Sequence, residues 1–183
     1  MGRYASRIWI KRQAVPERDR HKPIVVLMGV TGAGKTTVGR RLAHALGWPF
    51  LEGDDLHPPG NVEKMRRGVP LTDADRVPWF ERLRENIERY LDRNQPAVVA
   101  SSALREAYRV RLRPDPEAVR LVYLKGSRKL LCDRLEARAG HFMKSSLLES
   151  QLALLEEPAD ALVIDAALPV DEIVARIRAA FGI

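Results

Sequence analysis

The chain has 183 residues, 45% of them hydrophobic and 30% charged, which is ordinary for one globular domain with a sizeable core. No apolar run approaches the ~20 residues that a membrane-spanning helix needs, so no membrane partner is expected. Cys132 is the single cysteine, which excludes an internal disulfide bond and suits a cytoplasmic protein. The net charge of +7 raises the question of nucleic-acid binding.

Most of the positive charge lies in residues 1–22. Seven bases and two acids give this segment a net charge of +5, which leaves only +2 for residues 23–183. The segment has no long apolar stretch of the kind that marks a secretory signal. We therefore expect a disordered basic extension over 1–22 and one folded domain over 23–183. The nearly neutral body argues against a nucleic-acid partner.

Short apolar runs alternate with amphipathic stretches along residues 23–183. The apolar runs predict strands at 24–28, 50–53, 97–100, 119–124 and 161–164, and the other stretches predict helices near 35–46, 61–67, 73–93, 104–112, 127–138, 145–156 and 170–181. Residues 54–60 hold two prolines and a glycine and are expected to form a loop. Thr72 is the expected N-cap of the helix over 73–93, although Pro78 raises the alternative that regular helix begins only there.

This alternation predicts an α/β fold with a five-stranded parallel sheet and helices on both faces. Ligands of such sheets bind beyond the carboxyl ends of the strands. The glycine-rich segment follows the first predicted strand, Asp54 and His57 follow the second, and Ser102 and Arg105 follow the third. We expect these polar residues to meet at one edge of the sheet.

The segment GVTGAGKTT matches the P-loop pattern between a predicted strand and a predicted helix. Its backbone N–H groups are expected to surround the phosphates of ATP, with Lys35 at the β- and γ-phosphates and the Thr36 hydroxyl on Mg²⁺. The alternative is a plain glycine-rich turn, which the strand and helix on either side disfavour. The predicted nucleotide-binding residues are Gly29, Val30, Thr31, Gly32, Ala33, Gly34, Lys35, Thr36 and Thr37.

The carboxylate that usually helps to hold Mg²⁺ is missing from the end of the third strand, which reads Val99-Ala100-Ser101-Ser102. The nearest candidate is Asp54, after the second strand. Beside a γ-phosphate, this carboxylate could orient Mg²⁺ or accept a proton from an attacking hydroxyl. Asp54 and Asp55 could instead be turn residues, but the P-loop context favours a functional role.

Two further groups of residues have both a functional and an ordinary interpretation. Residues 57–76 contain cations, an amide and carboxylates suited to a polyhydroxylated anion, although spacing alone fits a solvated helix face. Arg134 and Arg138 share one face of a predicted helix that leads into Gly140. A lid near residues 139–146 could bring an arginine to the transferring phosphoryl group, whereas a surface charge pair is the alternative.

Five segments together resemble the gluconokinase family of P-loop kinases: GVTGAGKTTVGRRLA, FLEGDDLHPPGNVEKMRRGVPLTDADRVPWFERL, VVASSALREAYRVRLR, LVYLKGSRKLLCDRLEARAGHFMKSSLLESQLALLEEP and ALVID. The resemblance covers residues 24–183 and implies transfer of the ATP γ-phosphate to the 6-hydroxyl of D-gluconate, with Mg²⁺ and a homodimer. It implies catalytic roles for Lys35, Asp54 and Arg138, and a substrate-binding set of His57, Asn61, Lys64, Arg66, Arg76, Ser102 and Arg105.

Two other functions remain open at this point. A different P-loop small-molecule kinase, such as a shikimate kinase, would have the same fold. A P-loop ATP-binding module could instead bind nucleic acid through the basic extension. The block from His57 to Trp79 resembles the gluconokinases and favours the first function over both.

Overall fold

The computed structural model describes residues 22–137 and 145–183. The expected disordered extension, apart from Lys22, lies outside the described residues. So do Arg138 and most of the expected lid. Within the described ranges, no helix is both long and apolar enough to cross a membrane.

The centre of the fold is a five-stranded parallel sheet, as expected. Its strands are β1 (Ile24–Met28), β2 (Phe50–Glu52), β3 (Ala97–Ala100), β4 (Val119–Lys125) and β5 (Leu162–Asp165), in the spatial order β2-β3-β1-β4-β5. In the register, Val25 of β1 lies opposite Val98 of β3 and Arg120 of β4. Every residue of β1 is buried because strands flank it and helices cover both its faces.

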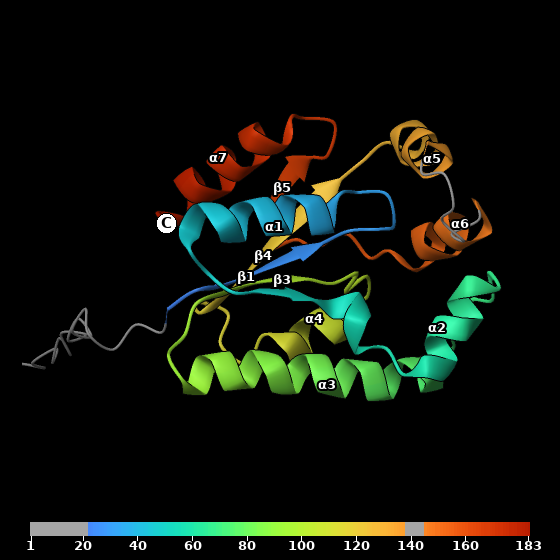
Figure 1. Cartoon of the computed structure of the whole chain (residues 1–183), viewed down its shortest axis with the longest axis horizontal. Coiled ribbons are helices and arrows are strands. Elements are labelled where there is room, and N and C mark those ends of the chain that lie inside the picture. Colours follow the sequence, from blue (N-terminus) through green and yellow to red (C-terminus); the bar gives the residue numbers. More distant parts are fainter. Residues whose placement is uncertain (1–21, 138–144) are drawn as a thin grey trace, which may run out of the picture.

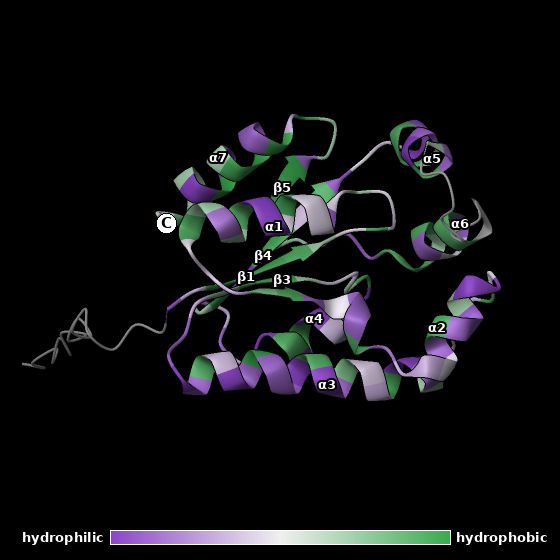
Figure 2. Cartoon of the chain, in the orientation of Figure 1, coloured by the Kyte–Doolittle hydropathy of each residue, from purple (hydrophilic) through white to green (hydrophobic). Residues whose placement is uncertain are grey.

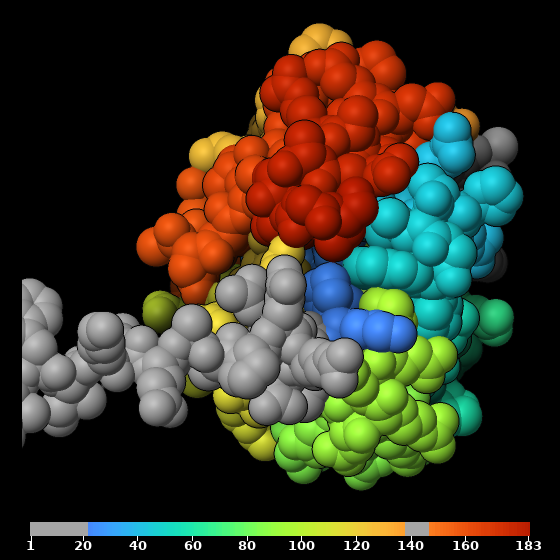
Figure 3. Space-filling view, turned by 90° about the vertical axis from the view of Figure 1, so that its left-hand side faces the viewer, coloured from blue at the N-terminus to red at the C-terminus, as the bar shows by residue number. Residues whose placement is uncertain are grey.

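Helices cover the sheet in two layers (Figure 1). The helices α1 (Lys35–Leu46) and α7 (Val170–Phe181) lie on one face, and α3 (Asp73–Asp92) and α4 (Glu106–Leu112) lie on the other. Three more helices, α2 (Pro59–Arg66), α5 (Arg128–Glu136) and α6 (Ser145–Leu154), lie beyond the carboxyl ends of the strands. The opposite end of the molecule is closed by the last turns of α1, α3 and α7 around the start of β1 (Figure 3).

The sheet separates two hydrophobic cores, and β1 contributes to both. Val25 and Leu27 pack with α1, α5, α6 and α7, while Ile24, Val26 and Met28 pack with α3 and α4. This alternation follows from the opposite directions of successive side chains in a strand. The helices correspondingly turn hydrophobic residues toward the sheet and hydrophilic ones outward (Figure 2).

One local expectation was wrong, whereas the expected N-cap of the helix after residue 72, Thr72, is confirmed. Residues 54–60 are not simply a loop, because they include most of the 3-10 helix η2 (Gly53–Leu56) and the start of α2 at Pro59. The helix α3 does not begin at Pro78 but runs through it from Asp73. A capping box explains this, since Thr72 and Asp75 exchange side-chain and backbone hydrogen bonds and so stabilise the first turn before the proline.

Candidate active site

The P-loop connects β1 to the N-terminus of α1, as the sequence predicts. Gly32 and Gly34 have φ angles of 82° and 93°, a left-handed conformation that glycine adopts without the steric cost of a Cβ atom. Lys35 Nζ lies over the loop and donates to the carbonyls of Gly29 at 2.9 Å and Val30 at 3.2 Å. The lysine therefore lies where phosphate oxygens bound by the loop would meet it.

Two helices that follow much later in the chain, α5 and α6, contact this loop. Gln151 of α6 accepts a hydrogen bond from the Thr31 backbone N–H at 2.7 Å. Arg134 of α5 donates to the carbonyl of Ala166, after β5, at 2.8 Å, and its Nη1 lies 3.5 Å from the Gly32 carbonyl oxygen. Arg134 was expected to share a helix face with Arg138, whereas no role was expected for Gln151. Nothing in the local pattern indicates that Gln151 reaches the P-loop.

Besides the expected Asp54, a carboxylate that no sequence pattern indicated lies beside the P-loop. Glu52 is the last residue of β2, and the Thr36 side chain hydrogen-bonds to it. Burial raises the pKa of Glu52, against the lowering effect of the Thr36 hydrogen bond. Glu52 Oε2 and Ser101 Oγ, at the end of β3, are buried and have no hydrogen-bond partner among the described residues. The third strand thus ends without an acid, while its neighbour β2 ends in the carboxylate of Glu52.

Gly53 lets the backbone that carries Asp54 pass close to the end of β3. A Cβ atom at Gly53 would lie 2.4 Å from the carbonyl oxygen of Ala100, so this close approach requires glycine. Asp54 follows and lines the pocket, whereas Asp55 does not. Trp79 of α3 donates from Nε1 to the Gly53 carbonyl at 2.7 Å and thereby holds the backbone that carries Asp54.

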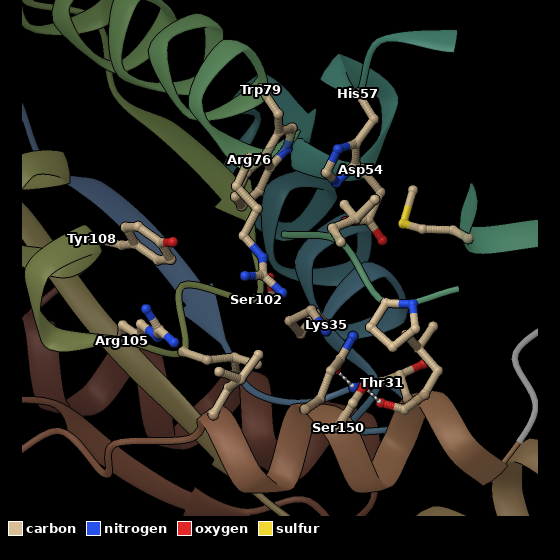
Figure 4. Close-up of a pocket in the computed structure, with 17 residues that line it drawn as sticks. Thr31, Lys35, Asp54, His57, Arg76, Trp79, Ser102, Arg105, Tyr108 and Ser150 are labelled. Carbon is tan, nitrogen blue, oxygen red and sulfur yellow. Dashed lines mark hydrogen bonds between the residues drawn. The ribbon is translucent and has the colours of Figure 1, made fainter. Parts of the chain in front are cut away.

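The pocket extends from the P-loop to the start of α4 (Figure 4). In Figure 4 the side chains of His57, Arg76, Arg105 and Tyr108 point into the same hollow as Lys35 and Asp54. His57 stacks on Trp79, with ring centroids 4.7 Å apart. Burial lowers the pKa of His57, so its imidazole is neutral at neutral pH. The other lining residues are Thr31, Met65, Pro70, Leu71, Trp79, Ser102, Leu104, Leu147, Ser150, Gln151 and Leu154.

Three residues of the expected substrate-binding set do not line this pocket: Asn61, Lys64 and Arg66. Asn61 is buried and donates to the Asp75 carbonyl at 2.7 Å, and Lys64 Nζ lies 2.6 Å from Asp75 Oδ1. These two side chains fasten α2 to the first turn of α3. They support the pocket wall, whereas His57, Arg76, Ser102 and Arg105 from the same set face the pocket.

Arg109 is a further residue that the sequence did not single out. It is 4% exposed, and its Nη1 donates to the carbonyls of Ala103 at 3.2 Å and Leu104 at 2.9 Å. Ala103 has a φ of 40°, a strained conformation for a residue with a Cβ atom. The buried guanidinium therefore supports the strained loop that carries Ser102 and Arg105.

Comparisons with known proteins agree with this geometry. A family model described as an AAA domain matches residues 24–158. The gluconokinase of Gluconobacter oxydans is 52% identical over 136 residues, which cover 74% of this chain and 76% of that protein. The chain belongs to the gluconokinase family. This family membership confirms the resemblance drawn from the sequence.

The chain also resembles solved structures in its fold. The crystal structure of a gluconokinase from Sinorhizobium meliloti has a TM-score of 0.79 and 44% identity, and the match covers 89% of this chain and 93% of that one. The shikimate kinase of Aquifex aeolicus has a TM-score of 0.56 at 18% identity, covering 87% of this chain and 96% of that one. At that identity the second likeness shows the shared fold alone. The gluconokinases are therefore the family, and the shikimate kinase alternative is not favoured.

Proposed function

We propose that this protein transfers the γ-phosphate of ATP to the 6-hydroxyl of D-gluconate, giving 6-phosphogluconate and ADP. The single observation that carries the proposal is the set of side chains that line one pocket. Lys35 and Asp54 lie in it together with Arg76 and Arg105. A P-loop lysine and a carboxylate suit phosphoryl transfer to a hydroxyl, and the two arginines suit the carboxylate of a sugar acid.

We assign the following roles to the P-loop and pocket residues. The P-loop N–H groups and Lys35 bind the phosphates and neutralise the charge that develops on the transferring group. Asp54 orients the 6-hydroxyl and accepts its proton as the new P–O bond forms. His57, Ser102, Arg76 and Arg105 bind the hydroxyl groups and the carboxylate of gluconate. Catalysis then rests on positioning and electrostatics and needs no covalent intermediate.

The residues beside Thr36 fit a magnesium ion. Mg²⁺ prefers oxygen ligands, keeps several of its waters and is usually held by one or two carboxylates and the substrate phosphates. Thr36 offers its hydroxyl, and the buried Glu52 Oε2 and Ser101 Oγ offer two oxygens that lack a partner among the described residues. Asp54 is the fourth candidate for an oxygen ligand. When bound, Mg²⁺ would supply charge neutralisation at the phosphates.

Three further parts of the proposal rest on the resemblance. Arg138, in a lid near 139–146, is proposed to reach the transferring phosphoryl group and to help exclude water. The protein is proposed to be a cytoplasmic homodimer with no nucleic-acid partner. Light scattering of the purified chain tests the dimer, and a gel-shift assay with and without residues 1–22 tests the absence of nucleic-acid binding.

An ADP-release assay tests the reaction. With Mg²⁺ present, D-gluconate should stimulate ADP release, while shikimate and nucleoside monophosphates should leave the basal rate unchanged. Equal turnover of shikimate and gluconate would contradict the proposed substrate.

A pair of variants tests the role of Asp54. Asp54→Asn should lower kcat by about two to four orders of magnitude, the usual contribution of a positioned general base, with ATP still bound. Asp55→Asn is the matched control, since Asp55 lies next in the chain but outside the pocket lining, and it should cost much less. A normal kcat in Asp54→Asn would refute the base. Recovery of kcat in excess Mg²⁺ would make Asp54 a metal ligand instead.

A further inference from the structure

Three pocket residues converge on one carboxylate that does not itself line the pocket. Asp73 accepts hydrogen bonds from Arg76 Nη1 at 3.0 Å, from Arg105 Nη1 at 2.9 Å and from the Tyr108 hydroxyl at 2.9 Å. Arg76 comes from α3, Arg105 is the N-cap of α4 and Tyr108 lies within α4. In Figure 4 Arg105 and Tyr108 lie on the side of the hollow away from Asp54, and the Arg76 guanidinium lies between. One carboxylate thus joins two elements that are distant in sequence.

The two oxygens of Asp73 divide these partners between them. Oδ1 accepts from Arg76 and Tyr108, and Oδ2 accepts from Arg105. The hydrogen bond from Tyr108, and then the charge of Arg105, lower the pKa of Asp73, so its carboxyl group is ionised at neutral pH. Without this anion the two guanidinium groups would repel each other. With it, the cluster of two arginines and one carboxylate has a net charge of +1.

We propose that Asp73 is a positioning residue that holds Arg76 and Arg105 in place for the carboxylate of the substrate, an inference that rests on the function proposed above. Free arginine side chains have many rotamers, and ordering them on binding costs affinity. Asp73 orders both arginines before the substrate arrives. The remaining charge of +1 matches a single carboxylate, so the cluster favours a sugar acid over a neutral polyol.

The cluster also sets the direction in which the substrate binds. Lys35 and Asp54 lie at the phosphoryl end, while Arg105 and Tyr108 lie across the hollow from Asp54 (Figure 4). A linear acid whose carboxylate meets the arginines would place its terminal hydroxyl toward Asp54. Asp73 thereby contributes to the choice of the 6-hydroxyl without touching it.

Substitution of Asp73 by asparagine tests the inference. In Asp73→Asn one acceptor oxygen becomes an N–H donor, which cannot accept from an arginine, so at least one of the guanidinium groups loses its anchor. We expect the KM for D-gluconate to rise about tenfold, equivalent to ~1.4 kcal/mol. The value of kcat and the KM for ATP should stay close to those of the wild type, because the P-loop and Asp54 are unchanged.

The matched control is Asp171→Asn. Asp171 also lies in the first turn of a helix, α7, and also pairs with an arginine, Arg41, at 2.7 Å, but outside the pocket. Any general effect of losing an acid at a helix N-terminus appears in both variants. An effect on substrate positioning appears only in Asp73→Asn.

A double-mutant cycle with Arg105→Gln completes the test. If Asp73 acts through Arg105, then Asp73→Asn should raise the KM for gluconate less in the Arg105→Gln background than in the wild type. An unchanged KM in Asp73→Asn, an equal rise in the KM for ATP, or full additivity in the cycle would overturn the inference. A wild-type protein that does not phosphorylate gluconate would overturn the proposed function instead, so the two failures are distinguishable.

Discussion

Trp79 connects the packing of α3 to the position of Asp54, so Trp79→Phe should affect both stability and catalysis. Trp79 is 3% exposed, and its Nε1 donates to the carbonyl of the buried Gly53 at 2.7 Å. Phenylalanine cannot donate, and the unpaired buried carbonyl costs about 1–3 kcal/mol. The smaller ring leaves a void that costs about 1 kcal/mol more. The free energy of unfolding should therefore fall by roughly 2–4 kcal/mol.

Urea unfolding of Trp79→Phe and of the control Trp48→Phe measures this loss. Trp48 is half-buried against the other core, so the same substitution there shrinks a ring without unpairing Gly53. We expect Trp79→Phe to be less stable than the control by about 1–3 kcal/mol, the cost of the unpaired carbonyl. Its kcat should also fall, because the backbone before Asp54 loses its anchor and His57 is left with a smaller ring to stack on. Equal stability of the two variants would refute this reasoning.

Two more predictions concern carboxylates near the site. Glu52→Gln should abolish the extra thermal stability that Mg²⁺ adds to the ATP-bound protein. The Tm of the ligand-free protein should stay unchanged or rise, because the substitution removes a buried carboxylate with a raised pKa. A full Mg²⁺ effect on the Tm of the variant would exclude a metal role for Glu52. Hydrogen bonds from Lys64 and then Thr72 lower the pKa of Asp75 from 3.8 to about 2, so its contribution to stability is present above pH 3.8 and is lost as the pH falls to about 2. The Tm of Asp75→Asn should accordingly lie below that of the wild type at pH 7 and approach it near pH 2, and a Tm difference that does not change with pH would contradict this linkage.

The fold class and the nucleotide site were predictable because their determinants are local in the sequence. A continuous apolar run, a glycine-rich loop and a helix follow one another over residues 24–46, and the structure keeps that order. The substrate-side residues were named from family resemblance. The sequence did not reveal which of them face the pocket, since His57 and Asn61 are four residues apart yet only His57 lines it.

Other features depend on contacts between distant segments. Glu52 and Ser101 come together because β2 and β3 are neighbours in the sheet, and no local pattern predicts that strand order. Asp73 reaches Arg105 across 32 positions of the chain, and Gln151 reaches Thr31 across 120. The sequence by itself therefore determined the α/β class, the P-loop and the family. Tertiary structure alone decided which carboxylates and arginines share the pocket, because only folding brings charges from separate elements within hydrogen-bonding distance.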